Sequence, residues 1–146
     1  MASDGTTTGP VLETAQHTYV PQLESAGRAR KFVQAVLRDW GIHPDDIELG
    51  MLLVSEAVTN AVIHCGGRPQ LVDLQVYLGL EEVTFVVTDR NQGVIVLREQ
   101  TPQATNGKGV FLIHSLAREW SVSVLPDGAG NVLIWTIAAS PMAMIV

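Results

Sequence analysis

The chain has 146 residues, of which 47% are hydrophobic and 16% are charged. This composition fits one globular domain with a sizeable core and excludes a disordered chain. The formal net charge is −6, which argues against direct nucleic-acid binding, because phosphate contacts need a clustered excess of Lys and Arg. Cys65 is the only cysteine, so an internal disulfide and a multi-cysteine metal site are excluded.

The ends of the chain differ from its middle. Residues 1–10 are small and polar, and we expect a disordered tail, then one domain over residues 11–140 and a short tail over residues 141–146. Residues 1–10 lack the basic start and apolar stretch of a signal peptide. No apolar run approaches the ~20 residues that a membrane helix requires. We therefore expect a cytoplasmic protein that does not bind a membrane.

Two long helices are predicted in the first half, after a strand within residues 11–20. Apolar residues recur at helical spacing from Ser25 to residue 40, and Gly41 suits the end of this first helix. The second helix is expected over about residues 45–65, because Pro44 and the two acids that follow it suit a helix start.

The second half reads as strands around a loop and a third helix. Alternating, β-branched stretches predict strands over residues 71–80 and 83–88. Residues 90–108 form a long polar loop, which in so small a domain is usually functional or mobile. A hairpin is expected over residues 122–138. The third helix is expected over residues 109–120, with an inward face made of Val110, Ile113, Leu116 (or Ala117) and Trp120.

This order of elements predicts an α+β fold. Strands in antiparallel hairpins alternate with separate blocks of helices, so one sheet covered on one face is the economical packing. We expect a two-layer sandwich with a mixed, mostly antiparallel sheet and about three helices.

A line of polar residues runs along the second helix. Glu56, Asn60 and His64 follow one another at i, i+4 and i+8, on one edge of a helix with 100° per residue. The sector opposite Glu56 is apolar, and the near face carries more apolar residues, so we expect this helix to be largely buried. These near-face residues are Leu49, Leu52, Leu53 and Ile63.

Several interpretations of this polar line remain open. A buried carboxylate without a partner is costly, and an unsatisfied amide costs roughly 1–3 kcal/mol, so a buried line needs something to bind. The line is alternatively a solvated stripe at the edge of the sheet, or a Glu–His pair closed on itself. As a metal site, Glu56 and Asn60 oxygens suit a hard ion such as Mg²⁺, completed by phosphate oxygens and water.

Two glycine segments follow. Asp89 ends a strand, where its carboxylate can accept a hydrogen bond from an exocyclic amine such as that of adenine, and Gly93 lets the backbone come close. Gly107, Lys108 and Gly109 stand at the start of the third helix, where amide N–H groups and the helix dipole favour phosphate oxygens. Each segment alone is a weak signal, and their order along the chain strengthens both.

Taken together, these residues resemble the GHKL ATPase superfamily, which has the Bergerat fold. Residues 55–64, SEAVTNAVIH, match almost residue for residue the N-box of the anti-sigma factor serine kinases and their actinobacterial relatives. Residues 29–41 are similar to the first helix of that subfamily. Residues 87–93 and 107–117 are similar to its two glycine boxes. The resemblance covers roughly residues 20–138.

The resemblance implies ATP and Mg²⁺ as ligands. It assigns Asn60 to Mg²⁺, Glu56 to activation of the attacking hydroxyl, and Asp89 to the adenine amine. Gly107 and Gly109 would hold the phosphates at a mobile lid, which residues 94–106 would form.

Other positions have supporting roles in this comparison. Lys108 would assist phosphate binding, His64 would steady the lid or the phosphates without being catalytic, and Gly93 closes the first glycine box. That box departs from the usual Asp-x-Gly-x-Gly, because Asn91 stands at the middle glycine. Asn tolerates a left-handed backbone better than most residues.

The resemblance implies a serine/threonine protein kinase that phosphorylates an anti-anti-sigma protein and sequesters a sigma factor. The alternative is a non-catalytic binding module with a degenerate nucleotide site. Relatives often pair as homodimers through the side of the sheet, and the resemblance leaves a homodimer open.

Overall fold

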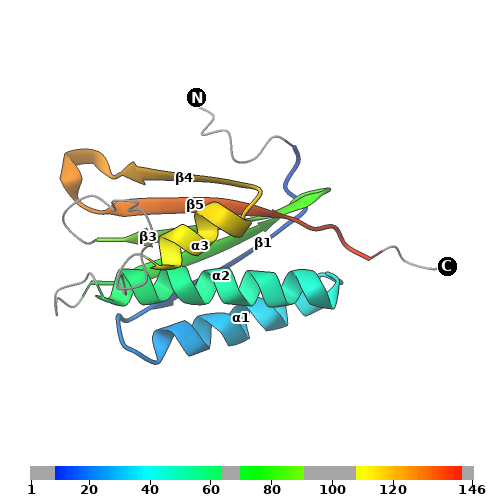
Figure 1. Ribbon diagram of the computed structural model, residues 1–146, viewed down its shortest axis with the longest axis horizontal. Coiled ribbons are helices and arrows are strands. Elements are labelled where there is room, and N and C mark those ends of the chain that lie inside the picture. The colour runs from blue at the N-terminus through cyan, green and yellow to red at the C-terminus, as the bar shows by residue number, and fades with distance from the viewer. Residues whose placement is uncertain (1–8, 64–69, 91–107, 143–146) are drawn as a thin grey trace.

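The computed structural model describes residues 9–63, 70–90 and 108–142 (Figure 1). Their helices and strands follow the order β1 (Glu13–Tyr19), α1 (Ser25–Asp39), α2 (Pro44–Ile63), β2 (Val72–Leu78), β3 (Glu82–Asp89), α3 (Lys108–Leu116), β4 (Glu119–Val124), η1 (Pro126–Gly128) and β5 (Asn131–Ala138). Of the helices described, none combines the length and the apolar character needed to cross a membrane.

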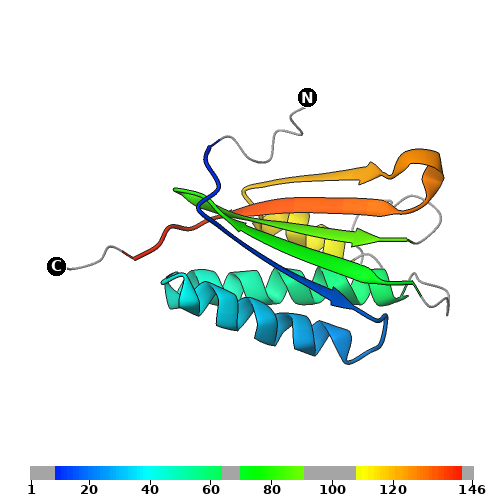
Figure 2. The same cartoon turned by 180° about the vertical axis from the view of Figure 1, so that it is seen from behind.

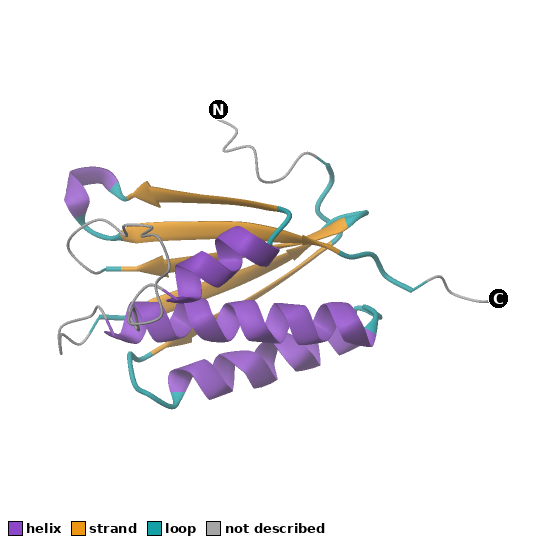
Figure 3. Cartoon of the chain, in the orientation of Figure 1, coloured by secondary structure: helices purple, strands orange, loops and turns teal. Residues whose placement is uncertain are grey.

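The described strands form one five-stranded sheet in the order β1-β2-β3-β5-β4, and every pairing in it is antiparallel. Figures 1 and 2 show the three helices on the same side of this sheet, and the colouring of Figure 3 separates the two layers. The predicted α+β sandwich is therefore confirmed. Strand β5 lies between β3 and β4, so the last of the described strands is an interior strand of the sheet.

The core lies between the sheet and the helices. Alternate residues of β2, β3 and β5 point toward the helices and are buried, as a sheet with one covered face requires. At its centre the rings of Phe85 and Trp135 stack with centroids 5.2 Å apart and an interplanar angle of 10°. This stacked pair joins β3 to β5, which are neighbours in the sheet although they are far apart in the sequence.

Helices α1 and α2 form an antiparallel pair that meets at a tight turn (Figure 1). The predicted stripe of α1 is buried, with Ala29, Val33 and Leu37 fully inaccessible. Gly41 follows the helix with a φ of 74°, as the expected helix end requires. Beyond β5, Pro141 forms a bridge with Ile42, so the start of the expected C-terminal tail packs on this turn.

Two sequence-based predictions about the helices are wrong. Helix α3 ends at Leu116 and not at residue 120, and Trp120 lies on β4. Leu116 is 45% exposed, whereas Ala117, the alternative inward residue, packs against the core. The reason is the sheet: Arg118 N–H donates to Thr136 O (2.8 Å), and Trp120 then pairs with Trp135. Helix α2 is not buried on every side as expected, because its outer face leaves the apolar residues Leu52 and Ile63 exposed by 41% and 51%.

Gly50 lets α2 approach the core closely. A Cβ atom at this position would lie 3.1 Å from Leu37 Cδ1 and 3.2 Å from Phe85 Cζ, which is tighter than ordinary packing. We predict that Gly50→Val lowers the free energy of unfolding by about 2 kcal/mol, the usual cost of overpacking a core, in urea denaturation. The matched control is Gly27→Val on α1, where a Cβ atom meets only the flexible end of Arg30. Equal losses in the two variants would contradict this account of α2 packing.

The burial of Tyr19 predicts that the fold loses stability at alkaline pH. Burial raises the pKa of its hydroxyl to about 12 from 10.0. Between these pH values the unfolded chain loses the proton and the folded chain keeps it, so stability falls as the pH rises. Within the described residues the buried hydroxyl has no hydrogen-bond partner. Tyr19→Phe should therefore keep the stability at neutral pH and flatten its decline above pH 10, measured by urea denaturation at each pH; an unchanged decline would refute the assignment.

Candidate functional site

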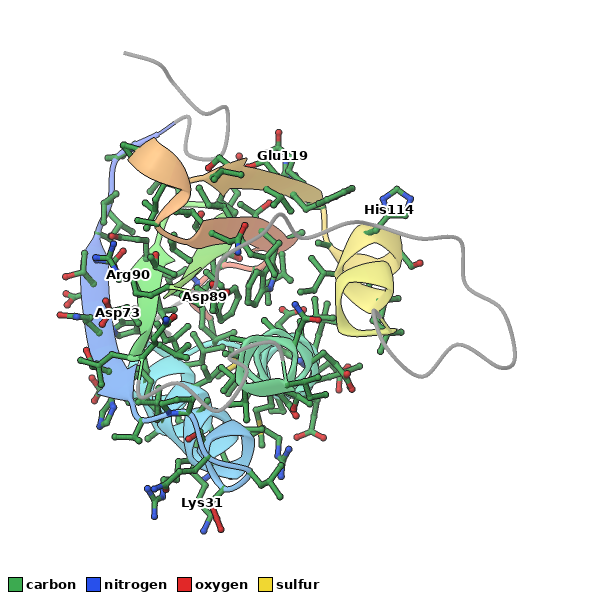
Figure 4. The ribbon with its side chains drawn as sticks, turned by 90° about the vertical axis from the view of Figure 1, so that its left-hand side faces the viewer. Lys31, Asp73, Asp89, Arg90, His114 and Glu119 are labelled. Atoms are coloured by element: carbon green, nitrogen blue, oxygen red, sulfur yellow. The ribbon has the colours of Figure 1, made fainter. Side chains whose placement is uncertain are left out.

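The predicted site residues that the structure describes gather at one end of the molecule. There α2 and β3 end, and α3 and β5 begin (Figure 1). Figure 4 looks onto this end, with Asp89 near the centre between the helices and the sheet. His64, Gly93 and Gly107, together with Asn91 and the expected lid over residues 94–106, lie outside the described residues.

Glu56 and Asn60 lie on the last two turns of α2. Asn60 is buried, with 8% of its surface exposed, and Glu56 is half-buried. Ser55 marks the side of α2 that faces α1, because its hydroxyl accepts a hydrogen bond from Arg30 Nη1 (2.8 Å). At 100° per residue, Glu56 and Asn60 lie on a different side of α2 from Ser55. Helix α3 also packs against α2.

The polar line of α2 thus runs along the boundary between the buried and the exposed faces of the helix. Asn60 is on the buried side of the boundary, so a fully solvated stripe does not describe this edge. Glu56 stands at the boundary itself, where a carboxylate is reachable from solvent and still held beside the core.

Asp89 is the last residue of β3 and is 4% exposed. It continues the row of Val83, Phe85 and Val87, so its side chain lies on the face of the sheet that the helices cover. Asn131 Nδ2 donates a hydrogen bond to Asp89 Oδ1 (3.3 Å). A carboxylate needs such a partner when it is buried, because desolvation otherwise penalises the charge.

Gly130 allows β5 to begin next to the end of β3. A Cβ atom at this position would overlap the backbone carbonyl oxygen of Asp89 and would lie 3.0 Å from Arg90 Cα. Only glycine fits, and its close approach brings Asn131 directly opposite Asp89 in the pairing register. The sequence analysis missed both Gly130 and Asn131. Their signal is a Gly-Asn pair at the start of a strand, which gains meaning only when the strand beside it is known.

Helix α3 begins at the predicted glycine segment, with Lys108 and Gly109 as its first two residues. Its N-terminus lies at the same end of the molecule as the end of β3 (Figure 1), where Asp89 is the last residue. Amide N–H groups at a helix start have no partner within the helix and favour an anion. An anion at this terminus would be close to the ends of α2 and β3.

The donor set fits a magnesium ion bound together with phosphates. Among the described residues no three His, Cys, Asp or Glu side chains gather to form a cage for a metal ion. Mg²⁺ seldom uses such a cage; it takes one or two protein oxygens and completes its shell with water and phosphate oxygens. Glu56 and Asn60 are the oxygen donors on this edge of α2 that can supply them.

Comparison with known families bears on this arrangement. No curated protein matches the chain. The family model of the histidine kinase-like ATPase domain matches residues 19–137, which run from the last residue of β1 almost to the end of β5 and include the site. Since this match spans well over half of the chain, the protein belongs to the family of histidine kinase-like ATPase domains.

Proposed function

We propose that this protein binds MgATP at the end of the molecule described above and phosphorylates a Ser or Thr of an anti-anti-sigma protein, thereby controlling a sigma factor. The observation that carries the nucleotide part is the buried carboxylate of Asp89, held at the end of a core strand opposite the start of β5 and between the sheet and the helices (Figure 4). The family match supports ATP binding. The likeness of residues 55–64 to the anti-sigma kinases supports the choice of partners.

The polar groups at this end of the molecule have separate roles in the proposed binding of MgATP. The Asp89 carboxylate accepts a hydrogen bond from the amine of adenine, and the amide N–H groups at the start of α3 bind phosphate oxygens. The Asn60 amide oxygen is a ligand for Mg²⁺, which supplies charge neutralisation when bound. Phosphoryl transfer asks mainly for positioning and charge stabilisation, and these groups provide both.

Glu56 serves the acceptor hydroxyl. Its carboxylate lies four residues before Asn60, one turn away on the same edge of α2, and is half-buried. It orients the hydroxyl of the substrate protein and takes its proton as the oxygen bonds to the γ-phosphorus and ADP departs. A hydroxyl of a second protein can reach this position because Glu56 stands at the solvent-facing edge of α2.

A regulatory binding module without catalysis is the second candidate. It is favoured by Asn91, which replaces the middle glycine of the first glycine box. Such a protein would sequester its partner with nucleotide bound weakly or absent. Transfer of phosphate separates the two candidates.

Asp89→Asn tests the adenine contact. The variant loses a charge-assisted hydrogen bond, so we predict ATP affinity lower by about tenfold or more in calorimetry with Mg²⁺ present. The matched control is Asp73→Asn, the same substitution on the opposite face of the sheet, where Asp73 Oδ1 accepts a hydrogen bond from the Thr18 hydroxyl (2.5 Å). Equal ATP affinities in the two variants would remove the role given to Asp89.

Glu56→Gln tests phosphoryl transfer. The amide has the size of the carboxylate and cannot take a proton, so transfer of label from ATP to a candidate anti-anti-sigma protein should slow by about 10²–10⁴-fold, with ATP affinity changed only a few-fold. Glu48→Gln is the matched control, an exposed glutamate two turns earlier on α2. Normal transfer by Glu56→Gln would refute the proton-acceptor role, and partner binding without transfer by the unaltered protein would favour the binding module.

A further inference from the structure

We propose that Asn131 is the positioning residue that makes this site selective for adenine over guanine, by holding the Asp89 carboxylate in one orientation. This inference rests on the nucleotide binding proposed above and adds a determinant of base specificity. The juxtaposition of Asn131 and Asp89, which lie opposite each other at adjacent strand ends, is its starting point.

Asn131 is an unexpected residue at its place in the sheet. It is 2% exposed and begins the row of Leu133, Trp135 and Ile137, all buried on the helix-facing side of β5. Asn is depleted in strands, and a buried amide must be compensated by hydrogen bonds. An apolar residue would suit this row better for stability alone, so the amide points to a requirement of the site.

The chemistry of the pair fixes how the amide is turned. An ionised carboxylate only accepts hydrogen bonds, so the amide must present its NH₂ group to it. The reversed amide would set its oxygen against the Asp89 oxygen, and the two would repel. The donor is therefore Asn131 Nδ2 and the acceptor is Asp89 Oδ1, and these two atoms lie 3.3 Å apart.

This hydrogen bond limits the freedom of the carboxylate. Asn131 belongs to an interior strand, and Gly130 brings its backbone against that of Asp89, so the donor is held beside the carboxylate. Asp89 is thus oriented before any ligand arrives. Preorganisation of this kind removes the ordering cost from binding and fixes which ligand group is met.

Orientation matters because an aspartate does not by itself distinguish the purines. Its carboxylate can accept from the 6-amino group of adenine, and equally from the N1–H and 2-amino groups of guanine. A carboxylate that turns freely can serve either base. One that is held toward the 6-position meets a donor in adenine and a carbonyl oxygen in guanine, and a site built around such a contact rejects the mismatched ligand strongly.

The test compares three ligands by calorimetry with Mg²⁺: ATP, GTP, and the triphosphate of purine riboside, which lacks the 6-amino group. We expect the unaltered protein to prefer ATP over GTP by about 100-fold or more. In Asn131→Leu, which is close in size and cannot donate, ATP affinity should fall by about tenfold. Affinity for the triphosphate of purine riboside should stay nearly constant. The preference for ATP over the other two ligands should therefore become smaller.

Two further variants separate positioning from folding. Asn131→Ala removes the donor without adding bulk, which guards against a disturbance of the strand by leucine. It should reduce the preference for ATP in the same way. Asn131→Thr replaces the amide donor by a hydroxyl donor, on a residue type that favours strands. It should retain more of the preference for ATP than the leucine and alanine variants do. Gln75→Leu, an amide replaced on the opposite face of the sheet, is the control and should leave all three affinities unchanged.

The outcomes are distinct. Equal loss of affinity for all three ligands in Asn131→Leu and Asn131→Ala would mean that Asn131 is only structural, and an unchanged preference would also overturn the proposal. Neither result contradicts the proposal that the unaltered protein binds ATP. If the unaltered protein binds none of the three ligands, the proposed function itself fails and this inference fails with it.

Discussion

The contact between the end of β3 and the start of β5 is the constraint on which the rest of the site depends. Gly130 has no side chain, so the two backbones meet closely enough to place the Asn131 amide against the Asp89 carboxylate. The stacked rings of Phe85 and Trp135 join the same two strands deeper in the core. Within the described part of the chain, the sheet's share of the polar site therefore stands on two neighbouring interior strands.

The helices add further polar groups to those of the sheet at this end of the molecule. The sheet offers a buried carboxylate, α2 offers an amide and a carboxylate along its edge, and α3 offers the amides of its first turn. These groups suit the base, the metal ion and the phosphates of one nucleotide, in that order. The net charge of −6 gives no general attraction for phosphates, so the proposed affinity for a nucleotide must come from local groups of this kind.

Local patterns in the sequence predicted most helices and strands. They did not predict the contacts between segments that are far apart in the sequence. The apolar stripe of α1 and the alternation of β2 and β3 identify these elements within a few residues. Trp120 was misplaced because its spacing from Ile113 and Leu116 fits a helix, and pairing with β5 decided the outcome. Asn131 was missed because Asp89, its partner, lies 42 residues earlier. Glu56 and Asn60 could be placed together from the sequence because one helix carries both.

The most direct test follows the side-chain amides of Asn60 and Asn131 by ¹H–¹⁵N NMR while MgATP is added to the labelled protein. The account predicts that both amides shift and saturate together with the backbone amides at the start of α3. The Gln16 amide, exposed on β1, should not move. Shifts that avoid Asn60 and Asn131 while the nucleotide binds elsewhere would contradict the placement of the site at this end of the sheet.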